Sequence, residues 1–331
     1  MKKSSCLLSV CAILSASLIA SSAQAKVTLR ALTCYPSNAP QEVDYKLFLK
    51  MVNETGGGVV QIQPIGGPEV IPATESGTAL SNGLFDVLFC PPSYYAGRFP
   101  EAWAFAAKLL PADEVRRRGG VEIYDKPLNE KMNAKFIAFA DGAAGLTTFS
   151  SRKIALREDG LPDLTGHRLR TAITYTPLFK ALGGTPITMP PGDVYTGLER
   201  GLIDGTGFNI LGVDTLGWDK FLKYIVLPPM QKGSTIVSMN LKKYNSLSDE
   251  EKAALRDVAP KYEAALEKQI ATLEREAADK YRKNGMTIVQ LSPEAGQKFQ
   301  SLWLEEYWKV VESTKGLTSD LGAIRKSFAG P

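Results

Sequence analysis

Short β-rich runs alternate with amphipathic helical stretches along most of the chain, and few architectures accommodate that order. Such alternation implies mainly parallel sheets covered by helices on both faces. The pattern resumes with different spacing after Gly142, and no low-complexity linker separates the two parts. We therefore expect two α/β lobes joined by more than one crossing of the chain. The predicted strands are 27–34, 59–65, 84–89, 146–150, 167–171, 185–189, 205–210 and 223–227, and the predicted helices are 41–53, 72–82, 176–182 and 193–200.

The C-terminal third predicts one long helix. Ser248 is a favourable N-cap, the acidic residues 249–251 suit the first turn, and apolar residues at steps of three and four continue to Asn284. At 1.5 Å per residue the helix would be about 50 Å long, which exceeds the width of a lobe of about 150 residues. Such a helix can brace both lobes. Pro260 predicts a kink, and two shorter helices broken there are the alternative.

The first 25 residues predict a cleaved export signal. Lys2 and Lys3 precede a run of about 15 apolar and small residues, and residues 23–25 (Ala-Gln-Ala) have the small-x-small pattern of a cleavage site. The run is shorter than the roughly 20 residues that span a bilayer. We expect export to the periplasm without a lipid anchor.

Charge and motif content argue against nucleic-acid binding and against most catalytic chemistry. Beyond Lys2 and Lys3 the basic residues outnumber the acidic ones by only about two, which gives no nucleic-acid footprint. His167 is the only histidine, so a histidine-based triad, a Cys-His dyad or a multi-histidine metal site would depend on it. The chain has no GxSxG, no GxxxxGK[ST] and no GxGxxG after a strand. We therefore expect that the protein is not an enzyme and uses no cofactor or metal. The alternative left open is a catalytic pair of carboxylates from distant positions in the sequence, as in glycosidases.

Cys34 and Cys90 are the cysteines that remain beyond the predicted signal. Each closes a predicted strand of the first lobe, and we expect these strands to be neighbours with the two Cα atoms less than about 10 Å apart. An oxidising compartment permits a disulfide. Because bonds between adjacent parallel strands are uncommon, we expect two free thiols.

Residues 163–205 carry the most specific pattern in the sequence. The segment begins DLTGHRLR and continues as GGTPITMPPGDVYTGLERGLIDG from residue 183. In order and spacing it resembles the DLxGxxxR and GxxPxxMPxxxVYxxLxxGxIDG stretches of the extracytoplasmic binding proteins of tripartite ATP-independent periplasmic (TRAP) transporters. The resemblance extends to the export signal and the long helix, and so covers essentially the whole mature chain.

The resemblance implies a type II periplasmic-binding fold, with two α/β lobes, a central cleft and the long helix bracing both lobes. We expect the first lobe to comprise 26–143 and 236–277, and the second 144–235 and 278–331. The implied function is capture of a small organic acid by lobe closure and its delivery to TRAP membrane subunits. A ligand sensor for a membrane receptor and, less favoured, a periplasmic enzyme are the alternatives.

Arg170 is the candidate carboxylate ligand. It ends the predicted strand 167–171, where open α/β sheets place ligand groups, and its planar guanidinium fits a carboxylate. In the family that the sequence resembles, the arginine ending this strand binds the substrate carboxylate. We expect Arg168, two positions earlier, to be a surface or structural residue. Packing in a core is the alternative role for each aromatic candidate, and surface exposure for the acidic one. The other expected wall residues follow strands of both lobes: Tyr35, Glu69, Tyr94, Thr148, Phe149, Phe208 and Asn209.

The sequence departs from the family at one position. Several acid-binding members carry a second arginine just before the segment that is 147–151 here, where this chain has Ala144-Gly145-Leu146. A second carboxylate would then lack a cation. We expect the ligand to be a monocarboxylate with an apolar or aromatic body.

Overall fold

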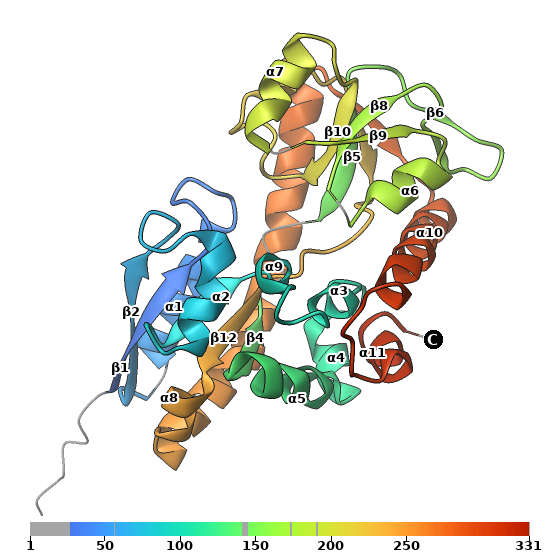
Figure 1. Cartoon of the computed structure of the whole chain (residues 1–331). Coiled ribbons are helices and arrows are strands. Elements are labelled where there is room, and N and C mark those ends of the chain that lie inside the picture. Colours follow the sequence, from blue (N-terminus) through green and yellow to red (C-terminus); the bar gives the residue numbers. More distant parts are fainter. Residues whose placement is uncertain (1–26, 56, 141–144, 173, 190, 331) are drawn as a thin grey trace, which may run out of the picture.

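The computed structural model has two α/β lobes, one above the other in Figure 1, each built around its own sheet. The structure describes residues 27–330 except 56, 141–144, 173 and 190, so the predicted export signal lies outside the described residues. The expected fold class is confirmed. Both sheets are mainly parallel, with helices on their faces, as the alternation of elements predicted.

The first lobe contains a five-stranded sheet in the order β2-β1-β3-β12-β4. Strand β1 is parallel to β2 and β3, whereas β12 runs antiparallel between β3 and β4. The pattern had not predicted β4 or β12. The strands are β1 (Val27–Thr33), β2 (Val60–Gly66), β3 (Val87–Cys90), β4 (Ala134–Phe139) and β12 (Ile236–Asn240), and the helices are α1 (Glu42–Thr55), α2 (Ala73–Ser81), η1 (Pro92–Tyr95), α3 (Ala102–Phe105), α4 (Ala112–Arg117), α5 (Gly120–Met132) and α8 (Leu241–Asn245).

The second lobe contains a six-stranded sheet in the order β13-β11-β5-β10-β8-β9. Here β5 is the antiparallel strand, between β10 and β11. Strands β5 and β12, which run antiparallel to their neighbours, directly follow the two segments in which the chain crosses from one lobe to the other. The strands are β5 (Leu146–Ser150), β8 (Arg168–Thr171), β9 (Thr185–Thr188), β10 (Gly205–Asn209), β11 (Tyr224–Leu227) and β13 (Thr287–Gln290), with the hairpin β6 (Ala155–Leu156) and β7 (Pro162–Asp163) and the helices α6 (Thr176–Ala181), η2 (Pro191–Asp193), α7 (Val194–Glu199) and η3 (Trp218–Lys220).

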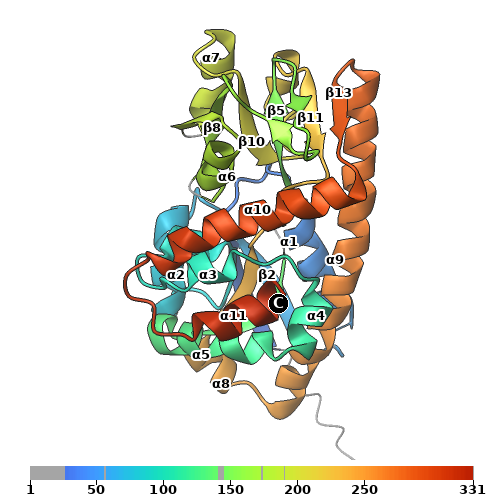
Figure 2. The same cartoon turned by 90° about the vertical axis from the view of Figure 1, so that its right-hand side faces the viewer.

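Helix α9 (Asp249–Lys283) runs along both lobes, as Figure 2 shows. Ser248 and Glu251 form a capping box at its start, and the helix continues through Pro260. Tyr262 is buried in the core of the first lobe, and Tyr281 is buried in that of the second. The predicted bracing helix is confirmed and the alternative of two separate helices is wrong. Among the described residues, no helix is long and apolar enough to cross a membrane.

The last two helices, α10 (Pro293–Glu312) and α11 (Leu321–Phe328), differ from the expectation for 278–331. Helix α10 contacts α6 of the second lobe and α3 of the first, and it lies across the molecule in Figure 2. Helix α11 packs on α3, α4 and α5, all in the first lobe. Helix α11 packs on the first lobe through its apolar face, where the centre of the Phe328 ring lies 4.9 Å from the centre of the Phe105 ring. The remaining lobe boundaries stay a prediction.

Cys34 and Cys90 form a disulfide, with their Cα atoms 5.3 Å apart. The expected proximity is confirmed, because β1 and β3 are parallel neighbours that end at the same edge. The expectation of free thiols was wrong. Cys34 lies one residue beyond β1, and its amide still donates to the Phe89 carbonyl at 3.1 Å, so the two cysteines stand opposite each other where the two strands end.

Candidate ligand-binding site

A cavity of about 250 Å³ opens between the lobes, where the carboxyl ends of several strands face each other. The first lobe contributes the segments that follow β1 and β3, and the second contributes the ends of β8 and β10 and the start of β5. The segment 231–235, which returns the chain from the second lobe to the first, completes the wall. Five of the eight predicted site residues line this cavity: Arg170, Tyr35, Tyr94, Phe208 and Asn209.

Arg170 is buried at the end of β8, with 4% of its surface exposed. Its Nε donates to the carbonyl of Met189 at 2.9 Å, and its Nη1 donates to the Tyr175 hydroxyl at 2.7 Å and to the Gly207 carbonyl at 3.2 Å. The guanidinium also lies 5.8 Å from the centre of the Phe208 ring.

These partners of Arg170 are all neutral. No carboxylate in the described part of the chain lies within 4.0 Å of its guanidinium nitrogens, and Nη2 has no hydrogen-bond acceptor there. A buried cation without an opposite charge is unfavourable by several kcal/mol. The arrangement therefore favours an anion in the cavity, held by the nitrogen that the protein leaves uncommitted.

Tyr175 was not predicted as a site residue. It precedes α6 and orients Arg170 through its hydroxyl. Burial raises the pKa of Tyr175, although the neighbouring Arg170 opposes the shift, so the hydroxyl stays neutral. Its position in the short segment between β8 and α6 was the available signal, since the rule that selected Arg170 places ligand groups at the carboxyl ends of strands.

Tyr35 connects the part of the cavity wall that follows β1 with the part that lies just before β12. Its hydroxyl lies 2.7 Å from Oγ1 of Thr235, just before β12, and its ring packs edge-on against Phe89. Burial raises the pKa of Tyr35, so this group is uncharged. In the opposite wall the Phe208 ring is held edge-on against Trp218, with ring centres 4.6 Å apart.

Three predicted site residues do not line the cavity. Phe149 is fully buried in the core of the second lobe, edge-on to Tyr281. Thr148 pairs with Gly207, which the Tyr175 ring covers, so it lies beneath the site. Glu69 is exposed and accepts a hydrogen bond from the Gly67 amide within its own turn at 2.7 Å. Strand parity and local turn chemistry account for these corrections.

Arg168 has the structural role expected of it. Its Nε and Nη2 donate to the two carboxylate oxygens of Asp204 at 3.0 and 2.8 Å. This pairing lowers the pKa of Asp204. His167, buried beside the Thr165 carbonyl, lies outside the cavity as well.

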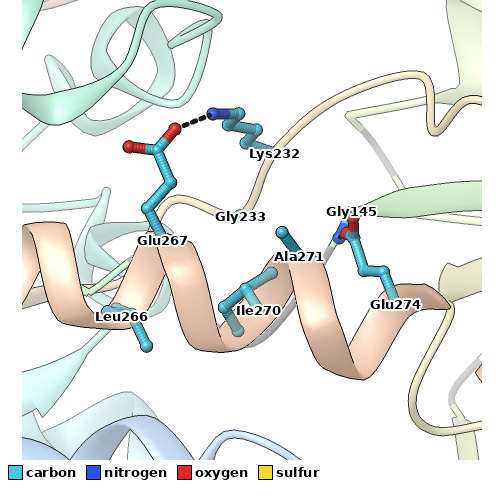
Figure 3. A pocket seen from close by; sticks show the side chains of 8 residues that line it. All are labelled: Gly145, Lys232, Gly233, Leu266, Glu267, Ile270, Ala271 and Glu274. Carbon is cyan, nitrogen blue, oxygen red and sulfur yellow. Dashed lines mark hydrogen bonds and ion pairs between the residues drawn. The ribbon is translucent and has the colours of Figure 1, made fainter. Parts of the chain in front are cut away.

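A second hollow lies against the middle of α9, beside both crossings of the chain (Figure 3). Its volume is about 140 Å³. Its charged groups are already occupied, because Lys232 pairs with Glu267 at 3.4 Å and Glu274 accepts from the Gly145 amide at 2.5 Å. Burial raises the pKa of Glu274. We assign this hollow to the hinge and not to a ligand.

Two lobes joined by several crossings, with a single buried cation among the described residues of the cleft between them, define the class of two-lobed solute-binding proteins. Across the described ranges, no three His, Cys, Asp or Glu side chains are grouped to hold a metal.

Comparison with known proteins identifies the family. The model described as "Bacterial extracellular solute-binding protein, family 7" matches residues 33–314, and the chain belongs to this family. The resemblance seen in residues 163–205 is thereby confirmed. The protein is an extracytoplasmic solute-binding protein and not an enzyme.

Named relatives share about a quarter of their residues with this chain. The ectoine-binding periplasmic protein TeaA of Halomonas elongata is 24% identical, over 83% of this chain and 82% of its own. A monocarboxylate 2-oxoacid-binding periplasmic protein of Nostoc is 25% identical, over 83% and 77%. Among solved structures, a TRAP periplasmic solute-binding protein of Rhodobacter sphaeroides in an apo open form has a TM-score of 0.78 at 15% identity, over 92% of this chain and 99% of that one.

Proposed function

We propose that this protein captures a monocarboxylate in the cleft, closes its lobes around it, and delivers it to the membrane subunits of a TRAP transporter. The observation that carries the proposal is the charge of the cavity. Of the described residues that line it, Arg170 alone is charged, and no carboxylate of the described part of the chain pairs with its guanidinium.

One guanidinium fits one carboxylate. Nε and Nη1 of Arg170 donate to the protein and fix the plane of the guanidinium, so Nη2 is the nitrogen that donates to the carboxylate. Such charge-assisted hydrogen bonds are short and directional, and an ammonium group on a flexible stem does not reproduce this fixed geometry. A second carboxylate enclosed in the same cavity would lose its hydration without gaining a cation, at a cost of several kcal/mol. Rings at Tyr35, Tyr94 and Phe208 supply apolar surface for the rest of the ligand.

Names of similar proteins support an acid as the ligand. The Nostoc relative is named for monocarboxylate 2-oxoacids, and solved structures of similar fold contain pyroglutamic acid or β-D-glucuronate. Delivery to a transporter follows the role of TRAP binding proteins. Export by cleavage after residue 25 is part of the same proposal and would place the mature protein in the periplasm.

The test is a binding screen of mono- and dicarboxylates of matched chain length, with metal ions removed, by thermal shift and then calorimetry. We expect monocarboxylates to bind tightest. Arg170→Ala should weaken binding of the best acid about 30-fold or more, because removing one member of a buried charge pair costs roughly 2–5 kcal/mol. Arg170→Lys should not restore it.

Arg168→Ala is the matched control. Arg168 lies two residues earlier on the same strand but outside the cavity, where it pairs with Asp204. It should leave the affinity for the acid within about twofold. Tightest binding of a dicarboxylate, or native affinity in a folded Arg170→Ala protein, would refute the proposal.

A further inference from the structure

Three residues stand in a row across the end of the second lobe's sheet. Leu146 pairs with Asn209 of β10 on one side and with Gln231 on the other, both antiparallel. Side chains of directly opposed residues lie on the same face of a sheet. All three line the cavity. The row thus presents an apolar side chain between two amides.

Gln231 is 3% exposed, and its Oε1 is buried without a hydrogen-bond partner in the described part of the structure. The orientation of its amide is set by the Nε2 group, which faces the Lys232 carbonyl at 3.4 Å. Turning the amide would oppose two acceptors, so Oε1 is the atom left over. A buried acceptor without a donor is unfavourable, and few persist without a reason.

The position of Gln231 relative to Arg170 determines which end of a bound ligand could donate a hydrogen bond to Gln231 Oε1. The Arg170 guanidinium reaches β10, where it donates to the Gly207 carbonyl. From β10 to the strand-like segment of Gln231 there are two strand spacings, about 10 Å in all. A ligand whose carboxylate lies on Arg170 therefore meets Gln231 with its opposite end.

We propose that the ligand carries a hydroxyl group at the end remote from its carboxylate, and that Gln231 Oε1 accepts a hydrogen bond from it. The inference rests on the proposed function and narrows its substrate class to hydroxylated monocarboxylates. Oε1 is an acceptor and the described lining residues include no acid, so a neutral donor fits better than an ammonium group.

The test compares two matched pairs of probes, 4-hydroxyphenylacetate with phenylacetate and 6-hydroxyhexanoate with hexanoate, on wild-type protein and on Gln231→Met. Wild type should bind the hydroxylated member of at least one pair about tenfold or more tightly, because a site built for a hydroxyl is left with an unpaired group when it is missing. In Gln231→Met that ratio should fall to less than about twofold, because the hydroxylated acid loses its acceptor.

Thermal unfolding without ligand separates this role from a structural one. Removing an unpartnered acceptor should leave the melting temperature of Gln231→Met equal to or above that of wild type. Gln63→Met, the same change at an exposed position of β2, should alter neither the ratio nor the melting temperature.

The outcomes that overturn the inference differ from those that overturn the proposed function. Equal affinity within both pairs, no binding of either pair, or a ratio that survives in Gln231→Met refutes the role of Gln231. If Arg170→Ala binds these acids as wild type does, the proposed function fails and the inference fails with it.

Discussion

Two arginines on β8 have the same chemistry and opposite surroundings. Arg168 has a side chain that is 45% exposed and meets a carboxylate, whereas Arg170 is buried and its partners within the described ranges are all neutral. Both point to one face of the strand, so their position along it decides their roles. Arg168 lies at the end of β8 that faces the start of β10, where Asp204 holds it, and Arg170 lies at the end that faces the cleft.

Asp204→Asn should lower the free energy of unfolding at pH 7 by about 1 kcal/mol, a modest value because Arg168 is partly exposed. Hydrogen bonding from Arg168 lowers the pKa of Asp204 in the folded protein. The carboxylate therefore stabilises the fold above its unfolded pKa, near 3.9, and this contribution is lost as pH falls through the lower folded pKa. Urea unfolding should show the difference from wild type shrinking below pH 4; a constant difference from pH 7 to pH 3 would contradict this account.

Helix α9 is attached to each lobe by a different kind of contact. In the first lobe Glu263 accepts from Arg116 at 2.6 and 2.7 Å and from the Phe139 amide at 2.8 Å. In the second lobe Tyr281 donates to the Ile210 carbonyl at 2.7 Å, directly after Asn209 of the cavity. The helix thus fixes the rear of both lobes while the cleft lies on the other side of the crossings.

Glu263→Ala should destabilise the protein by about 3 kcal/mol, because it removes the carboxylate that pairs with Arg116 and leaves the buried Phe139 amide without its acceptor. The matched control is Glu267→Ala, one turn further along α9. Glu267 is 54% exposed and pairs with Lys232 at 3.4 Å, so its loss should cost less than about 1 kcal/mol. Urea unfolding of both variants measures the contrast, and equal losses would show that burial does not set the strength of these pairs.

Elements with a local period could be predicted from the sequence, and elements defined by distant partners could not. The long helix and five strands of the second lobe, β5, β8, β9, β10 and β11, follow from spacing alone, whereas the short edge strand β13 was not predicted. Strand β12 is inserted antiparallel between β3 and β4, which are far from it in the chain, and no local pattern reveals such an insertion. In the site, Arg170 carried a motif, whereas Gln231 lies in a crossing segment whose place depends on the packing of both lobes.

At the scale of the molecule, the cleft separates the two lobes on one side, and shared elements connect the lobes on the other side. The chain passes between the lobes after β4 and again after β11, α9 runs along both, and α10 contacts both (Figure 2). Motion about such a hinge brings the walls of the cavity together while the rear contacts persist. An acid that touches both walls stabilises the closed form by the contacts it makes only there.

We expect the radius of gyration, measured by small-angle X-ray scattering, to decrease when the tightest-binding acid of the screen is added at saturation. Arg170→Ala, at the same concentration of acid, should keep the radius of the ligand-free protein. An unchanged radius for saturated wild type would mean that the lobes do not close on the ligand.

The disulfide has a consequence for how binding and oxidation are coupled. Cys34 precedes Tyr35, and Cys90 precedes the segment 91–94, so the bond joins two parts of the cavity wall. If holding them together favours the liganded form, oxidised protein binds the acid more tightly than reduced protein. Linkage is reciprocal, so the acid must then make the bond harder to reduce by the same factor. A loaded molecule would keep its cystine under conditions that open an empty one, and thiol reactivity would report occupancy.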